Sequence, residues 1–158
     1  MSNTHHYEAT INWKGNLGQG TKEYRGYSRN HEAQIASKPV IELSSDPAFR
    51  GDKTRHNPEE LLVISISSCH MLWYLHLCAV AGVVVTDYSD NATGILEESP
   101  DGSGKFSEVV LHPIVTVQTT DIVDKAKELH KEAHKMCFIA NSCNFPIKHE
   151  PVIRVLEK

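Results

Sequence analysis

Two cysteines stand in contexts that could support thiol redox chemistry. Cys69 lies in NPEELLVISISSCH (57–70), which has the pattern of an apolar helix, and Cys137 lies in AHKMCFIANS (133–142), where an amphipathic helix ends. A lone helical cysteine is usually a small core residue without reactivity. Two such thiols, one of them in a segment that begins with carboxylates, favour dithiol redox chemistry.

The composition is that of one soluble globular domain. The chain has 158 residues, of which 40% are hydrophobic and 23% charged, and its net charge is −4. This balance, without a run of Lys or Arg, argues against a nucleic-acid partner. The first ten residues contain no apolar run that would read as a secretion signal, so the four cysteines are expected to be reduced thiols. We therefore predict a single cytoplasmic domain over 1–158.

Hydrophobic periodicity predicts an α+β fold. Strands are expected at 6–14, 21–28, 39–43, 83–98, 105–118 and 151–156, and helices at 58–81 and 122–136. An Asp-Gly turn joins the two long strands. The resulting order is β-β-β-α-β-β-α-β, with antiparallel hairpins rather than repeated βαβ units.

Local signals mark the ends of both helices. Asn57 suits the N-cap of the first helix, and Glu60 is placed to complete a capping box. Gly82 is expected to end that helix. Thr120 or Asp121 is expected to cap the second helix, whose apolar side chains recur at helical spacing: Ile122, Ala126, Leu129, Ala133 and Met136.

The first helix has no continuous polar face between Leu61 and Ala81. Serines and histidines interrupt it, so a packed helix in a soluble protein explains it better than a membrane span. One sheet and one amphipathic helix would hardly cover such a helix. A two-fold dimer that packs through this helix is therefore favoured, the alternative being a sheet that wraps around it within one subunit.

The two cysteine motifs together resemble the OsmC/Ohr family of osmotically inducible and organic-hydroperoxide-resistance proteins. The family's Asn-Pro-Glu start, with a cysteine ten residues beyond the Glu, is met by Asn57, Pro58, Glu59 and Cys69. Its Ala-His-x-x-Cys pattern, followed by Asn-Ser, is met within 133–142. Element order and chain length match as well, so the resemblance covers essentially the whole chain.

The resemblance implies an OsmC-like fold, with antiparallel sheets wrapped around two long central helices in an intertwined homodimer. It implies a cofactor-independent peroxidase in which Cys69 attacks an organic hydroperoxide and Cys137 resolves the sulfenic acid as a disulfide. A dithiol, such as a lipoyl group or a small thiol, would recycle the enzyme. An arginine paired with Glu59 is expected near the reactive thiol. Arg50 is preferred for this role over Arg25.

This sequence departs from the family pattern in three places. Phe138 follows the second cysteine, where proline is common, and the first hairpin GNLGQG carries no arginine. His70 and Trp73 follow Cys69, where many members have plain apolar residues. The substrate preference is therefore not carried over from either namesake.

The chemistry sets requirements on the surroundings of the thiols. The attacking species is a thiolate, and burial raises a thiol pKa, so Cys69 needs a nearby cation. Glu59 lies about 15 Å from Cys69 along one helix, so it would serve the Cys69 of the other subunit. Its alternative role is favourable placement of an acid in a first turn. Cys137, near a helix C-terminus, suits the resolving role.

The remaining candidates are assigned lesser roles. Cys78 and Cys143 are interpreted as bystanders, and a zinc site built from Cys69-His70 and His134-x-x-Cys137 is disfavoured because adjacent helical residues point apart. His112, His130 and His149 are interpreted as surface residues. The competing function is a binding or sensing protein on the same fold, with a hydrophobic ligand and thiols that oxidise without turnover. The two functions differ in whether an arginine is held beside Cys69.

Overall fold

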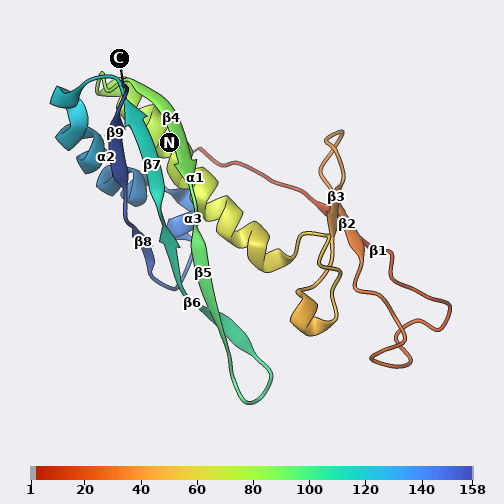
Figure 1. Ribbon diagram of the computed structural model, residues 1–158. Coiled ribbons are helices and arrows are strands. Elements are labelled where there is room, and N and C mark those ends of the chain that lie inside the picture. The colour runs from red at the N-terminus through yellow and green to blue at the C-terminus, as the bar shows by residue number, and fades with distance from the viewer. Residues whose placement is uncertain (1–2, 158) are drawn as a thin grey trace. The chain divides into compact units, whose positions relative to one another are not determined.

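The computed structural model describes residues 3–157, and Figure 1 labels their helices and strands. The chain divides into two compact units, Met1–Leu61 and Leu62–Lys158. The first contains β1 (Thr10–Trp13), β2 (His31–Gln34), β3 (Ile41–Leu43) and a 3-10 turn, η1 (Pro47–Phe49). Helix α1 (Pro58–Val80) begins in the first unit and continues into the second, whose other elements are given below.

The first unit is an antiparallel sheet in the order β1-β2-β3. The predicted strand over 21–28 is wrong, because these residues form turns and bends, and the second strand begins at His31. The guanidinium of Arg29 lies 4.5 Å from the ring of Tyr24 and 4.0 Å from that of Tyr27. It also donates hydrogen bonds to both backbone carbonyls, at 2.7 and 2.6 Å. Those carbonyls therefore bond to a side chain instead of a neighbouring strand.

The expected ends of α1 are confirmed. The Glu60 N–H donates to Oδ1 of Asn57 at 2.8 Å, and the Asn57 N–H donates to Oε2 of Glu60 at 3.2 Å, which completes the capping box. At the other end Gly82 adopts φ +72°, and the N–H of Val83 bonds to the carbonyl of Cys78 at 2.9 Å. A left-handed residue here reverses the chain and satisfies a terminal carbonyl of the helix.

The second unit contains two three-stranded sheets, β4-β7-β9 and β5-β6-β8. The bounds of the strands are β4 Val85–Asp90, β5 Thr93–Glu98, β6 Gly104–Leu111, β7 Pro113–Val117, β8 Ile147–His149 and β9 Val152–Val155. The two long predicted strands each divide and pass from one sheet to the other. At the break, the N–H of His112 bonds to the carboxylate of Asp90 at 2.7 Å, and Pro113 has no N–H to offer.

The last strands pair in a way that the sequence analysis did not predict. β8 is parallel to β6 and β9 is parallel to β7, so both sheets are mixed rather than antiparallel throughout. The α+β class is nonetheless confirmed. Two helical elements precede β8: α2 (Val123–Met136) and a short helix, α3 (Phe138–Asn141). A 3-10 turn over Thr120–Ile122 leads into α2 without a side-chain cap, so the expected cap at Thr120 or Asp121 is wrong.

The core of the second unit lies where α1, α2 and the β4-β7-β9 sheet meet. It includes Tyr74 and Cys78 of α1, Val115 and Val117 of β7, and the apolar face of α2. The buried side chains of α1 recur every four residues, at Ile66, His70, Tyr74 and Cys78. On α2 the predicted apolar face is confirmed for Ala126, Leu129 and Ala133, whereas Met136 is exposed.

Only part of the apolar surface of α1 is buried within the chain. Ile64, Leu72 and Val80 are 52%, 60% and 74% exposed, and they lie eight residues apart along the helix. By length and composition alone α1 could cross a membrane, a test that the core helices of soluble proteins also pass. Each step of eight residues turns the side chain by about 80° around the axis, so Ile64 and Val80 lie about 160° apart and the exposed apolar side chains wind around α1.

Candidate active site

The structure brings the two predicted redox cysteines together. Cys69 lies midway along α1, and Cys137 lies where α2 ends and α3 begins. The Cys69 side chain lies close enough to Cys137 to be among the groups that raise the pKa of the Cys137 thiol, after the larger effect of burial. All four cysteines are free thiols, with Cys69 partly buried and Cys137 buried. The structure therefore places the two thiols near one another, from α1 and from the junction of α2 and α3.

Cys137 is held as a thiol. Burial is the main cause that raises its pKa to about 11, and the N–H of Ala140, which donates to its sulfur at 3.4 Å, opposes that rise. The sequence analysis placed Cys137 only at a helix C-terminus, but it is also the N-cap of α3. At neutral pH Cys137 therefore remains a thiol, which suits a resolving residue better than an attacking nucleophile.

The other two thiols have surroundings of their own. Cys78 is buried against Tyr74 and Val83 in the core of the second unit, and burial raises its pKa. Cys143 donates to the carbonyl of Ile139 at 3.3 Å, and burial raises its pKa as well. Neither residue is among the causes that shift the pKa of Cys137. Both remain bystanders in this interpretation.

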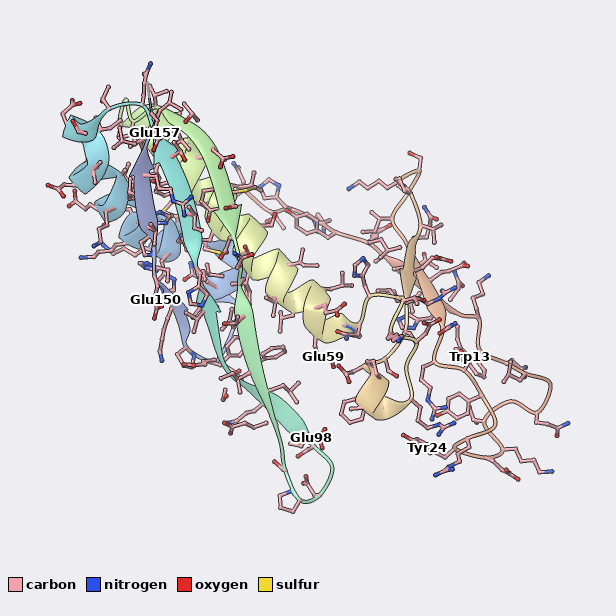
Figure 2. The ribbon with its side chains drawn as sticks, viewed as in Figure 1. Trp13, Tyr24, Glu59, Glu98, Glu150 and Glu157 are labelled. Carbon is pink, nitrogen blue, oxygen red and sulfur yellow. The ribbon has the colours of Figure 1, made fainter. Side chains whose placement is uncertain are left out.

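The expected arginine–glutamate pair is not formed within the first unit. Glu59 lies on the first turn of α1 (Figure 2), and its Oε2 is buried without a hydrogen-bond partner among the described residues. Arg50 is exposed, with φ +65°, and makes no ion pair within residues 3–157. Arg55, by contrast, pairs with Glu42 at 3.1 Å. The described chain therefore leaves a buried carboxylate oxygen unsatisfied and leaves Arg50 unengaged.

The sequence analysis missed a cluster of four histidines between α1, α2 and β8, of which His70 and His130 are buried and His134 and His149 are partly buried. Nε2 of His70 is 3.0 Å from Nδ1 of His130, and the two rings are parallel to within 7°. The ring of His149 lies 5.6 Å from that of His70, and the ring of His134 lies 5.7 Å from that of His149. Tyr74 stacks on His130 at 3.8 Å. The assignment of His130 to the surface is wrong, since its exposure is 0%.

Burial keeps His70 and His130 neutral, and the cluster contains ring nitrogens without hydrogen-bond partners within the part of the chain that the structure describes. Burial lowers the pKa of His70 to about 4 and that of His130 to about 3, and the neighbouring imidazoles add to both effects. Each of the four histidines has one buried ring nitrogen without a hydrogen-bond partner in the described chain. Within residues 3–157 no three His, Cys, Asp or Glu side chains are grouped so that they could hold a metal ion. The periodicity of α2 contained a signal for this burial, because His130 follows Leu129 on its apolar face.

A cleft of about 500 Å³ opens on another part of the second unit. It is lined by α1 residues from Val63 to Met71 and by the β4–β5 connection from Tyr88 to Ala92. Neither Cys69 nor Cys137 lines it. At its edge the hydroxyl of Ser67 donates to the carboxylate of Asp90 at 2.5 Å. The cleft is therefore separate from the predicted redox site.

Comparison with known proteins places the chain in a family. A family model described as OsmC-like protein matches residues 51–151. The solved structure of an OsmC-like protein of unknown function from Vibrio cholerae is 30% identical, with a TM-score of 0.85, and the match covers 94% of this chain and 100% of that one.

More distant structures share the fold. An organic hydroperoxide resistance protein from Elizabethkingia anophelis, with bound thiocyanate, is 18% identical with a TM-score of 0.71 over 99% of this chain and 100% of the other. A Legionella pneumophila organic hydroperoxide resistance protein OsmC is 17% identical with a TM-score of 0.70 over 98% and 100%. No curated protein matches the chain. The family match and the 30% identity over nearly the whole chain show that this protein belongs to the OsmC-like family.

Proposed function

We propose that this protein is a cysteine-based peroxidase that reduces organic hydroperoxides in the cytoplasm and is recycled by a dithiol such as a lipoyl group or a small thiol. The observation that carries the proposal is the proximity of the Cys69 and Cys137 side chains, together with the burial that keeps Cys137 a thiol. The organic hydroperoxide resistance proteins from Elizabethkingia and Legionella, which share the fold, support the choice of substrate class.

The proposed reaction has two steps on these sulfurs. The Cys69 thiolate attacks the terminal oxygen of ROOH; an S–O bond forms, the O–O bond breaks, and the alkoxide leaves and takes a proton from solvent to become ROH. Cys137 then attacks the sulfur of the sulfenic acid; an S–S bond forms, the S–O bond breaks, and hydroxide leaves as water with the proton of Cys137. The two sulfurs together lose two electrons, and the peroxide gains them.

The cation that this reaction requires is proposed to come with a second copy of the chain. A thiolate in a partly buried position needs a positive neighbour, and a guanidinium paired with a carboxylate is an oriented one. The unpartnered Oε2 of Glu59 and the unengaged Arg50 support a pair that forms only across a subunit interface. Arg25, which is also exposed, is the second choice.

The same second copy would cover the exposed apolar side chains of α1. Ile64, Leu72 and Val80 are exposed on the part of α1 that the core leaves open, with the exposed polar residues Ser68 and His76 between them. Large apolar side chains that are exposed on a helix of high overall hydropathy are consistent with an association surface. A two-fold axis beside α1 would pack this part of the helix against its counterpart and would bring Glu59 of one chain toward Cys69 of the other. We therefore include an obligate homodimer with composite sites in the proposal.

Turnover and trapping of the oxidised state test the proposed activity together. The purified protein with a dithiol reductant is expected to consume cumene hydroperoxide catalytically. Without reductant, one equivalent should remove two thiols per chain and yield a Cys69–Cys137 crosslinked peptide in mass spectrometry. Cys137→Ser should instead leave a sulfenic acid at Cys69 that dimedone labels. Oxidation without catalytic turnover would favour a redox sensor, and a dominant Cys69–Cys143 or intersubunit link would contradict the assignment of Cys137.

Mixing of inactive variants tests the composite site. Glu59→Ala and Cys69→Ser homodimers each have both sites impaired, but a heterodimer of the two has one intact site. Refolding an equal mixture is expected to recover about a quarter of the wild-type activity, since half of the dimers are mixed and half of their sites are whole. The matched control mixes Cys69→Ser with Cys137→Ser. These two thiols meet within one chain, so no site is restored and no recovery is expected. An active monomer in sedimentation, or no recovery in the first mixture, would overturn the composite site.

A further inference from the structure

Two residues that stand apart in the sequence meet beside the thiol pair. Trp73 follows Cys69 by four residues on α1, and Phe138 directly follows Cys137 as the first residue of α3. Their ring centroids are 5.5 Å apart with an interplanar angle of 84°. Residues four apart on a helix lie on the same face, so Trp73 and Cys69 are neighbours. The same two elements that join the sulfurs therefore also join the two rings.

The two rings of the aromatic pair differ in exposure, because Trp73 is partly buried and Phe138 is exposed to solvent. Trp73 is partly buried and packs against the core of the second unit, and it makes a second edge-to-face contact with His76, at 5.8 Å and 84°. Phe138 is 65% exposed, so the ring that faces Trp73 on one side is open to solvent on the other. An edge-to-face pair with an open ring can accept a third aromatic ring in the same kind of contact.

We propose that Trp73 and Phe138 form a specificity wall that selects hydroperoxides with an aryl group on the carbon that bears the peroxide. This inference rests on the proposed function. The rise from Cys69 to Trp73 is about 6 Å along the helix. When the terminal oxygen of such a hydroperoxide meets the Cys69 sulfur, its aryl ring begins only a few bonds away, within reach of the indole. An alkyl group of similar bulk gains contact area there but no ring–ring interaction.

Kinetic comparison of two hydroperoxides tests the wall. Cumene hydroperoxide and tert-butyl hydroperoxide are both tertiary, and they differ by the replacement of a methyl group with a phenyl group. In Phe138→Leu and in Trp73→Leu, the ratio of kcat/KM for the cumene to the tert-butyl substrate is expected to fall about three- to tenfold, which is the range of one aromatic contact. Trp73→Phe should retain most of the ratio. The control Tyr7→Leu removes an aromatic ring that is 90% exposed in the first unit and should leave the ratio at its wild-type value.

A binding measurement separates this inference from the proposed function. Trp13→Phe leaves Trp73 as the sole tryptophan, so its fluorescence reports on the wall. The unreactive alcohol 2-phenyl-2-propanol is expected to change that fluorescence saturably, whereas tert-butanol should not, and addition of Phe138→Leu should weaken the aryl binding. If neither hydroperoxide is turned over, the proposed function fails. The fluorescence titration then tests by itself whether Trp73 and Phe138 bind an aryl group. An unchanged kinetic ratio in Phe138→Leu, or no saturable effect of the aryl alcohol, overturns the wall.

Discussion

Replacement of Cys69 by serine is expected to lower peroxide consumption by on the order of 10³-fold or more, because a serine hydroxyl is not ionised at neutral pH and an active site rarely survives the loss of its nucleophile. The fold should persist, since Cys69 is only partly buried and serine is of nearly the same size. Steady-state reduction of cumene hydroperoxide with a dithiol measures the rate, and circular dichroism checks the fold.

The matched control for this variant is Cys78→Ala. Cys78 lies on the same helix, about 13 Å from Cys69 along the axis, and is buried in the core away from the thiol pair. Alanine introduces no polar group there, and the rate should stay near that of the wild type. A Cys69→Ser protein that turns over at the parental rate would remove Cys69 from the mechanism. Equal losses in both variants would point to general damage to the core.

The second large effect is on stability at acid pH, and it comes from the histidine cluster. The pKa values of His70 and His130 fall from the ordinary 6.5 to about 4 and about 3 on folding, chiefly through burial. The groups that add to these shifts are other imidazoles, and Lys131 acts on His149 in the same direction. No carboxylate is among these causes, so nothing in the cluster compensates a proton.

The sign of the effect follows from which state binds protons first. Below pH 6.5 the unfolded chain takes up protons on these imidazoles, while the folded chain keeps them neutral. The contribution of these two histidines to the free energy of unfolding is therefore fully present above pH 6.5. It decreases as the pH falls toward 4 and then 3. One pKa unit corresponds to about 1.4 kcal/mol, so the shift of His70 alone amounts to about 3 kcal/mol. For a domain of ordinary stability this is a large fraction of the total.

Urea denaturation at fixed protein concentration, repeated from pH 7.5 to pH 4, measures this loss. His130→Asn keeps a polar side chain but removes a titrating group, so its stability should depend less steeply on pH than that of the wild type. The control, His6→Asn, removes an exposed imidazole and should retain the wild-type slope. The test compares how steeply the free energy of unfolding changes with pH, and this slope can be compared even if the variant is less stable than the wild type. Equal slopes in the wild type and His130→Asn would show that the cluster does not control acid stability.

The features that the sequence predicted correctly depend on neighbours along the chain. The capping box of Asn57 and Glu60 joins residues three apart, and the end of α1 at Gly82 depends on one residue's access to positive φ. The buried face of α2 follows from helical spacing. The spacing from Glu59 to Cys69, together with the second cysteine motif, was enough to indicate the family.

The features that the sequence did not predict depend on contacts between distant segments. The parallel pairing of β8 and β9, and the division of both long strands near Asp90 and His112, are set by which sheet edges meet in space. A segment rich in turns, from 21 to 28, had the alternation of a strand, but Arg29 holds its carbonyls in another arrangement.

The amino-acid sequence by itself determined the ends of α1, the apolar face of α2 and the two cysteine motifs, because caps and periodic faces are short-range properties of a chain. Only the tertiary structure decided that Trp73 meets Phe138 and that His130 is buried beside His70, whereas the proximity of Cys69 and Cys137 was already expected from the family resemblance. Each of these pairs joins α1 to the C-terminal segment across more than fifty residues. Proximity over such a separation arises from the packing of helices and sheets into one core, and no local pattern encodes it.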